Sequence, residues 1–415
     1  MRRIPFWFGL AIVGVAVCGL AVLAFAVLAG LAQANEYDWE KATPESQGMD
    51  GGRLDTLRQD LEARDTTVFL VVKNGQMVYE WYSEKSSSNS LPTNVKNLIR
   101  RSILGRGPEH QRNNLGAMGK LLYSSMVLMT AVEDGYIGLD DPAWKYIPAW
   151  KDDLERSGIT IRHLITLTSG IENVKYPDEQ EGWKGEFSRN PDARFSLANS
   201  TAPVLYPPGT HYVYSSTGIF SLHYALTAAL KDSPQPDIRA RLKERIMQPS
   251  GIPDDDWLIG DEHTYDVDGM QLHGISARYT ARTVAQLGQL LLQSGSWEGQ
   301  QVLDPESVEM MLNYAGTPDL ERPENTPGTA HGAWTNFDGI WPALPTDAMV
   351  SAGAGHKMML VVPSLDLIAV RFGGPLDGTV GATASGGPYF EALEQNIFNP
   401  LMASIIGSPD APAQR

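Results

Sequence analysis

The chain contains very little cysteine, since Cys18 is the only one among 415 residues. An intramolecular disulfide is therefore impossible, and an oxidising compartment is permitted by the sequence without being indicated by it. Basic residues are outnumbered, because 33 Lys and Arg stand against 49 Asp and Glu, for a formal net charge of −16. Nucleic acids and anionic membrane surfaces recruit clustered basic side chains, so this balance argues against either as a partner.

Several catalytic and metal-binding patterns are also missing. No Gly-x-Ser-x-Gly sequence occurs, which excludes the nucleophile turn of the α/β-hydrolases. The eight histidines show no spacing of the His-Glu-x-x-His type, so the sequence predicts neither a metal site nor a cofactor. With 42% apolar residues and ten tryptophans, the chain can nevertheless bury a sizeable core.

A long apolar run is present at the N-terminus, where two arginines precede 26 uncharged residues from Phe6 to Leu31. About 20 apolar residues span a bilayer, whereas the apolar part of a signal peptide needs only about 7–15. The length favours a single-pass anchor over residues 1–34, with the following domain on the periplasmic side of the cytoplasmic membrane. Cleavage after Ala34 is the alternative and would give a secreted protein. In both cases we expect residues 35–406 to form one exported domain and residues 407–415 a disordered tail.

Two hairpin patterns frame the exported part. Residues 67–73 and 76–82 are joined by Asn74-Gly75, whose residues readily adopt positive φ, and residues 357–363 and 367–372 form the second pair. Helical patterns cover residues 52–63, 117–134, 160–170, 218–231, 238–248, 280–294, 305–315 and 389–406, while residues 172–203 are expected to form a loop. We therefore expect an α/β (α+β) fold in which both ends of the chain meet in one antiparallel sheet, with an all-helical subdomain beside it.

Three short motifs follow one another along the chain. The first is Ala117-Met118-Gly119-Lys120, the second is Tyr214-Ser215-Ser216 after a Pro-Gly-Thr turn, and the third runs from Ser351 to His356. This order resembles the serine β-lactamase-related hydrolases, namely class C β-lactamases, DD-peptidases and related esterases, whose motifs are Ser-x-x-Lys, Tyr-x-Asn and Lys/His-x-Gly. Residues 162–170, RHLITLTSG, resemble a further stretch of that family. The resemblance implies a serine β-lactamase-like fold with its pocket where the sheet meets the helical part.

The chemistry of the arrangement also follows from the residues. Positions 117 and 120 are one helical turn apart, so both side chains lie on one face, near a helix N-terminus that favours a developing oxyanion. A lysine or a tyrosine held nearby can act as the base toward a hydroxyl nucleophile. We therefore assign the catalytic site to Ala117, Lys120, Tyr214 and Ser216, and substrate binding to Ser351, Gly353, Gly355 and His356.

Position 117 departs from the family pattern because alanine has no nucleophilic atom. In serine hydrolases whose catalytic groups act as a unit, loss of the nucleophile costs on the order of 10⁶ in turnover. Ser216 stands in place of asparagine, and Ser351 stands in place of a basic residue. Ser124 and Ser125 lie deeper in the same predicted helix, and we expect them to bond its carbonyls rather than to replace the nucleophile.

Two functions are compatible with these residues. The first is an exported hydrolase of esters, amides or D-amino-acid peptides that is inactivated at Ala117, with a small-molecule or peptide substrate in its pocket. The second is a natural pseudoenzyme that binds a ligand, or that serves as a membrane-tethered scaffold for a protein partner. An engineered and an inherited alanine leave the same sequence, so the residues do not distinguish these two origins.

Overall fold

The structure is a computed structural model and describes residues 37–84, 107–174, 181–260, 264–317, 319–379 and 384–407. The anchor or signal peptide predicted over residues 1–34 lies outside these residues, as does all but the first residue of the tail predicted over residues 407–415. In the described ranges, no helix combines the length and the apolar character that crossing a membrane requires.

A seven-stranded antiparallel sheet, in the order β10-β11-β12-β13-β14-β1-β2, forms the centre of the fold. The hairpin predicted around Asn74-Gly75 is confirmed, with φ of 52° and 72° at the two turn residues. β1 also pairs with β14, which aligns Leu70 with Val370, so both ends of the chain meet in one sheet as predicted. The strands are β1 (Thr66–Lys73), β2 (Gln76–Tyr82), β10 (Gly328–Thr329), β11 (Trp334–Thr335), β12 (Met349–Gly353), β13 (Lys357–Val362) and β14 (Leu367–Gly373).

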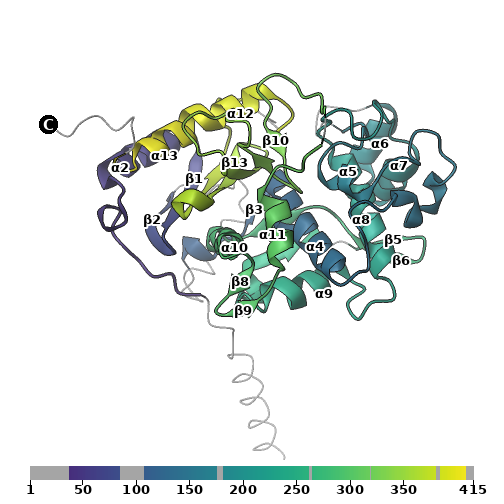
Figure 1. The fold of residues 1–415 in the computed structure, drawn as a ribbon, viewed down its shortest axis with the longest axis horizontal. Helices are drawn as coiled ribbons and strands as arrows, with labels where there is room; N and C mark the ends of the chain where they lie inside the picture. The colour runs from purple at the N-terminus through teal and green to yellow at the C-terminus, as the bar shows by residue number, and fades with distance from the viewer. Residues whose placement is uncertain are drawn as a thin grey trace, which may run out of the picture.

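Helices cover both faces of this sheet (Figure 1). α2 (Gly51–Glu62), α12 (Gly387–Leu393) and α13 (Asn399–Ala403) lie on one face, and α10 (Ala281–Leu292) lies on the other. Gly288 brings α10 close to the sheet, because a Cβ atom at this position would meet Met359 Sδ at 3.2 Å. Since side chains alternate along a strand, the odd-numbered residues of β13 face α10 and the even-numbered ones face the terminal helices.

A second, mainly helical part lies beside the sheet, at the right of Figure 1. Its helices are α4 (Met126–Glu133), α5 (Ile161–Ile165), α6 (Gly182–Arg189), α7 (Arg194–Ser200), α8 (Ser216–Leu230) and α9 (Ile238–Leu242). The remaining α-helix is α11 (Pro305–Leu312). The remaining strands are short: β3 (Asn113–Asn114), β4 (Trp257–Ile259), β5 (Thr264–Val267), β6 (Met270–His273), β7 (Ala277–Tyr279), β8 (Ser296–Trp297) and β9 (Gln300–Gln301).

The prediction of a loop over residues 172–203 is wrong where α6 and α7 form. Each of these helices places one aromatic side chain against Phe220 of α8, with ring centroids 5.3 Å away for Phe187 and 5.1 Å away for Phe195. A single aromatic anchor in a short helix leaves too weak a periodic pattern to reveal the helix from sequence. Residues 175–180 of the predicted loop lie outside the described residues.

The helix predicted over residues 117–134 is divided into three segments. A 3-10 turn spans Gly116–Met118, a π-helical segment spans Lys120–Ser125, and α4 follows. π-Helical segments also interrupt the helices predicted over residues 238–248 and 389–406. The first motif therefore lies where a 3-10 turn changes to a π-helical segment, and not inside a regular α-helix.

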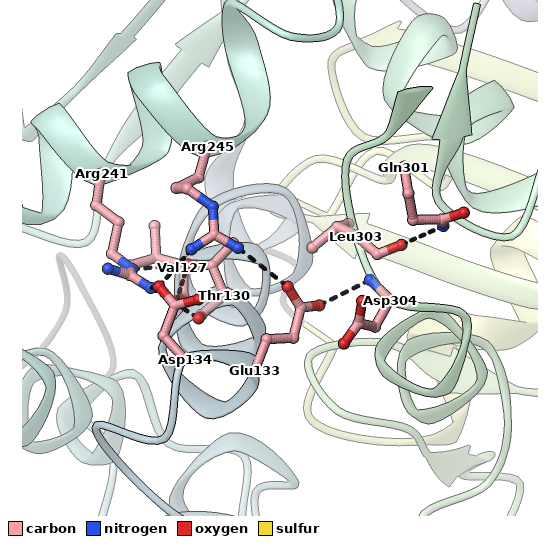
Figure 2. Close-up of polar contacts among 9 residues, drawn as sticks. All are labelled: Val127, Thr130, Glu133, Asp134, Arg241, Arg245, Gln301, Leu303 and Asp304. Atoms are coloured by element: carbon pink, nitrogen blue, oxygen red, sulfur yellow. Dashed lines mark hydrogen bonds and ion pairs between the residues drawn. The ribbon is translucent and has the colours of Figure 1, made fainter. Parts of the chain in front are cut away.

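Polar contacts fix the far end of this helix to its neighbours (Figure 2). Arg241 of α9 is fully buried and donates to the hydroxyl and the carbonyl of Thr130, at 2.8 and 2.7 Å. Asp134 accepts from both Arg241 and Arg245. Glu133 accepts the backbone N–H of the N-cap residue of α11 at 2.9 Å. The helix that carries Lys120 is therefore anchored at its C-terminal end by α9, the segment after it, and α11.

Candidate active site

Lys120, Tyr214 and Ser216 meet at one point, although the first two are 94 residues apart in the chain. The Nζ atom of Lys120 lies 3.1 Å from the Tyr214 hydroxyl and 3.3 Å from Ser216 Oγ. Lys120 and Tyr214 are only 4% and 9% exposed, and Ser216 is half-buried. Three of the residues assigned to the catalytic site therefore lie within hydrogen-bond reach of one another, as proton transfer requires.

The starts of two helices hold these side chains in place. Lys120 opens the π-helical segment, and Ser216 is the first residue of α8. The hydroxyl of Ser215 caps α8 by accepting the Gly218 N–H at 2.9 Å. Asn173 fixes Ser216 from another loop, because its Oδ1 accepts the Ser216 N–H at 2.8 Å. The sequence did not identify Asn173 as a residue of the site. The only indication was its position shortly after the stretch 162–170, which resembles the family.

Ala117 lies in the 3-10 turn of the first motif and is partly exposed. Gly116 adopts a φ of 57°, and its N–H donates to the Asn114 side chain at 2.8 Å. Gly353 packs against this turn so closely that a Cβ atom on it would clash with a backbone carbonyl and would lie 3.0 Å from the Ala117 nitrogen. The first and third motifs are therefore in contact, and only glycine fits at position 353.

Hydrogen bonds to the first motif and to α12 hold the rest of the third motif in place. Ser351 is fully buried, and its hydroxyl lies 3.4 Å from the Met118 carbonyl. The Gly353 carbonyl accepts from the Tyr389 hydroxyl at 2.6 Å. Gly355, which is partly exposed, turns the chain with a φ of 77°. Of these predicted substrate-binding residues, Gly355 reaches the surface, whereas Ser351 and Gly353 join the strand to the first motif.

His356 is assigned to substrate binding by the sequence, yet its side chain is fully buried. Its ring stacks on Tyr389 with 4.5 Å between the centroids, and its Nδ1 accepts the Leu376 N–H at 3.2 Å. Burial lowers the pKa of His356 to about 4, so the ring is neutral at neutral pH. This placement is that of a residue that supports the turn of the third motif rather than one that faces a ligand.

Ser124 bonds a histidine, and not a helix carbonyl as expected. Its Oγ lies 2.8 Å from His223 Nε2, and His223 Nδ1 lies 3.2 Å from the His273 carbonyl. Burial lowers the pKa of His223 to about 4. These distances suit a nucleophile and its base, but Ser124 and His223 are 1% and 0% exposed. The pair therefore lies inside the core, whereas Ala117 is partly exposed.

The site can bind and polarise a carbonyl group. Lys120 and Tyr214 offer N–H and O–H donors of the kind that stabilise an oxyanion. Within the described ranges, His, Cys, Asp and Glu side chains form no group of three or more that could hold a metal ion. A covalent acyl intermediate needs a nucleophilic atom, which the methyl group of Ala117 does not supply.

Comparison with known proteins places this arrangement in a family. A family model described as Beta-lactamase matches residues 54–370, which is most of the chain. An uncharacterised protein of Alkalihalophilus pseudofirmus is 24% identical over 323 residues, which cover 76% of this chain and 86% of that relative.

Several solved structures share the fold of this chain. A penicillin-binding protein homologue from Caulobacter crescentus is 14% identical, with 84% of this chain and 99% of that chain covered and a TM-score of 0.57. Simvastatin synthase from Aspergillus terreus is 16% identical, with 85% and 97% covered and a TM-score of 0.59. Likenesses at such low identity show the fold alone. The family match goes further, and it establishes that the chain belongs to the beta-lactamase family.

Proposed function

We propose that this protein binds an acyl compound, namely an ester, an amide or a D-amino-acid peptide, at the Lys120 cluster without transferring its acyl group. The observation that carries the proposal is the combination of Ala117 with an intact hydrogen-bonded group of Lys120, Tyr214 and Ser216 beside it. The donors that hold a carbonyl are retained, while the atom that attacks it is absent. The domain is then a ligand-binding pseudoenzyme of a hydrolase family.

The family relationship supports the class of ligand. One neighbour is named a penicillin-binding protein homologue and another simvastatin synthase, and penicillin and simvastatin both contain acyl carbonyl groups. Without a nucleophile, a ligand of this kind stays intact, since loss of the nucleophile in such a unit costs on the order of 10⁶ in turnover. The buried Ser124–His223 pair supports this reading, because the alternative serine with the best geometry is enclosed in the core.

Turnover of chromogenic esters tests the assignment. The protein itself should show no hydrolysis above the background rate, whereas Ala117→Ser should gain activity, because its hydroxyl would lie one helical turn from Lys120. The double variant Ala117→Ser, Lys120→Met is the matched control and should lose that gain. Hydrolysis by the unchanged protein would show that another nucleophile serves. Failure of Ala117→Ser to gain activity would count against the placement of the site.

We also propose that the domain acts outside the cytoplasmic membrane. The support is the sequence of residues 1–34, in which two arginines precede a long apolar run. Protease treatment of cells with a permeabilised outer envelope should digest the domain while a cytoplasmic marker stays intact. Protection of the domain until the inner membrane is lysed would contradict this location.

A further inference from the structure

His223 lies on the same face of α8 as Ser216, two helical turns further along the helix. Residues seven apart on an α-helix project from one side, and here both contact the π-helical segment. Ser216 Oγ lies 3.3 Å from Lys120 Nζ at the start of that segment, and His223 Nε2 lies 2.8 Å from Ser124 Oγ near its end. Two polar contacts therefore join the same pair of elements.

The hydrogen bonds of His223 have defined directions. Its Nδ1 lies 3.2 Å from the His273 carbonyl, which can only accept, so Nδ1 carries the proton of the ring. Burial lowers the pKa of His223 to about 4, so the ring is neutral at neutral pH and Nε2 is left as an acceptor. The Ser124 hydroxyl therefore donates to Nε2. Because both ring nitrogens are bonded, the imidazole is fixed in one tautomer and one orientation.

His223 also joins the π-helical segment to the chain that packs on the first motif. Its ring lies edge-on to Tyr123 of the segment, with 4.8 Å between the ring centroids. His273, whose carbonyl it bonds, is the last residue of β6. Two residues later, the carbonyl oxygen of Ile275 lies so close to the first motif that a Cβ atom on Gly119 would meet it at 3.4 Å. One buried side chain therefore holds two elements that border the first motif.

We propose that His223 is a positioning residue, which sets the place of Lys120 by holding the π-helical segment through Ser124. This proposal rests on the proposed function, since it concerns the group of residues assigned there to the ligand carbonyl. π-Helical hydrogen bonding is rare, so we expect a contact from another helix to stabilise it. The C-terminal end of the helix is anchored by Arg241 (Figure 2), so a return of the segment to α-helical bonding would move its first residue, Lys120, relative to Tyr214.

Crystal structures and ester turnover of variants test this role. In His223→Leu, the separation of Lys120 Nζ from the Tyr214 hydroxyl should rise from 3.1 Å to beyond about 3.5 Å, where the hydrogen bond is lost. Ser124→Ala removes the same contact with little change of volume and should also lengthen this separation. In the Ala117→Ser background, each change should lower kcat/KM for a chromogenic ester about 10²-fold, as a displacement of about 1 Å near a reacting group does.

Two further variants distinguish positioning from a general effect on stability. His223→Gln retains an amide oxygen that can accept from Ser124, so it should restore most of the turnover and the short separation. Tyr224→Phe is the matched control, because it removes a 2.6 Å hydrogen bond to Asp268 from the next residue of α8. It should leave the turnover and the separation unchanged.

The outcomes separate this role from the proposed function. An unchanged separation in both His223→Leu and Ser124→Ala would overturn the proposal, as would equal losses in Tyr224→Phe or no rescue by His223→Gln. Urea unfolding shows whether each variant is folded, and Ser124→Ala tests the contact if His223→Leu is not. Absence of turnover in Ala117→Ser would count against the proposed function alone, because the separation is measured in the chain that retains alanine at position 117.

Discussion

Replacement of Gly353 by alanine tests whether contact between the first and third motifs positions the site. The new Cβ atom would clash with a backbone carbonyl, and it would lie 3.0 Å from the Ala117 nitrogen and 3.3 Å from the Met118 nitrogen. These atoms belong to the backbone of a turn, so they cannot swing aside as the end of a flexible side chain can. Relief of the clash therefore requires β12 and the turn to move apart.

The size of the effect follows from that clash. Overpacking of this kind costs about 1–3 kcal/mol of the free energy of unfolding. A shift of about 1 Å near a reacting group lowers turnover about 10²-fold. We therefore expect Gly353→Ala to destabilise the protein by that amount in urea unfolding, and to lower ester turnover in the Ala117→Ser background about 10²-fold. Gly386→Ala is the matched control, because nothing lies within 4 Å of a Cβ atom there and its φ is −177°.

Two results would refute this reasoning. If Ala117→Ser, Gly353→Ala is as stable and as active as Ala117→Ser, then the two motifs do not depend on their contact. If Gly386→Ala causes the same losses, then the effect reflects a general sensitivity to substitution at glycine. Loss of stability with unchanged turnover would limit the role of the contact to holding the fold together.

Two further predictions concern stability. Asp134→Ala removes the carboxylate partner of fully buried Arg241 and should lower the free energy of unfolding in urea by about 3 kcal/mol. This value is at the lower end for buried pairs because Asp134 is 32% exposed. An unchanged urea midpoint would show that the pair contributes nothing to stability. Burial lowers the pKa of His223, His331 and His356 to about 4 from an ordinary value of 6.5. The unfolded chain therefore takes up protons before the folded protein does, and stability should fall as the pH drops from about 6.5 to about 4; a urea midpoint that is equal at pH 7 and pH 5 would contradict this.

The sequence was sufficient to predict the two hairpins of the sheet, β1–β2 and β13–β14, because their signals are local, whereas β10 and β11 were not predicted. Asn74-Gly75 specifies a hairpin turn between two β-prone segments, and the pairing of β1 with β14 follows from strands at both ends of the chain. α6 and α7 escaped prediction because the contacts of Phe187 and Phe195 with Phe220 hold them, and such contacts are visible only once α8 is in place.

The candidate site was predictable to the extent that its residues lie in motifs. Lys120 and Tyr214 were found because each belongs to a short recognisable pattern. The contact of Asn173 with the backbone of Ser216 could not be inferred, because it forms only when the loop that carries Asn173 meets the start of α8. The burial of His356 could not be inferred either, because it depends on contact with Tyr389, which follows much later in the chain, in α12.

Position 117 is, in our proposal, the position of the nucleophile that this protein lacks. Labelling with a fluorophosphonate probe, followed by mass spectrometry of the peptides, tests it most directly. We predict that the unchanged protein carries no label, and that Ala117→Ser carries one label at residue 117 that is lost with Lys120→Met. A label on any serine of the unchanged protein, or an Ala117→Ser protein labelled elsewhere, would contradict the account.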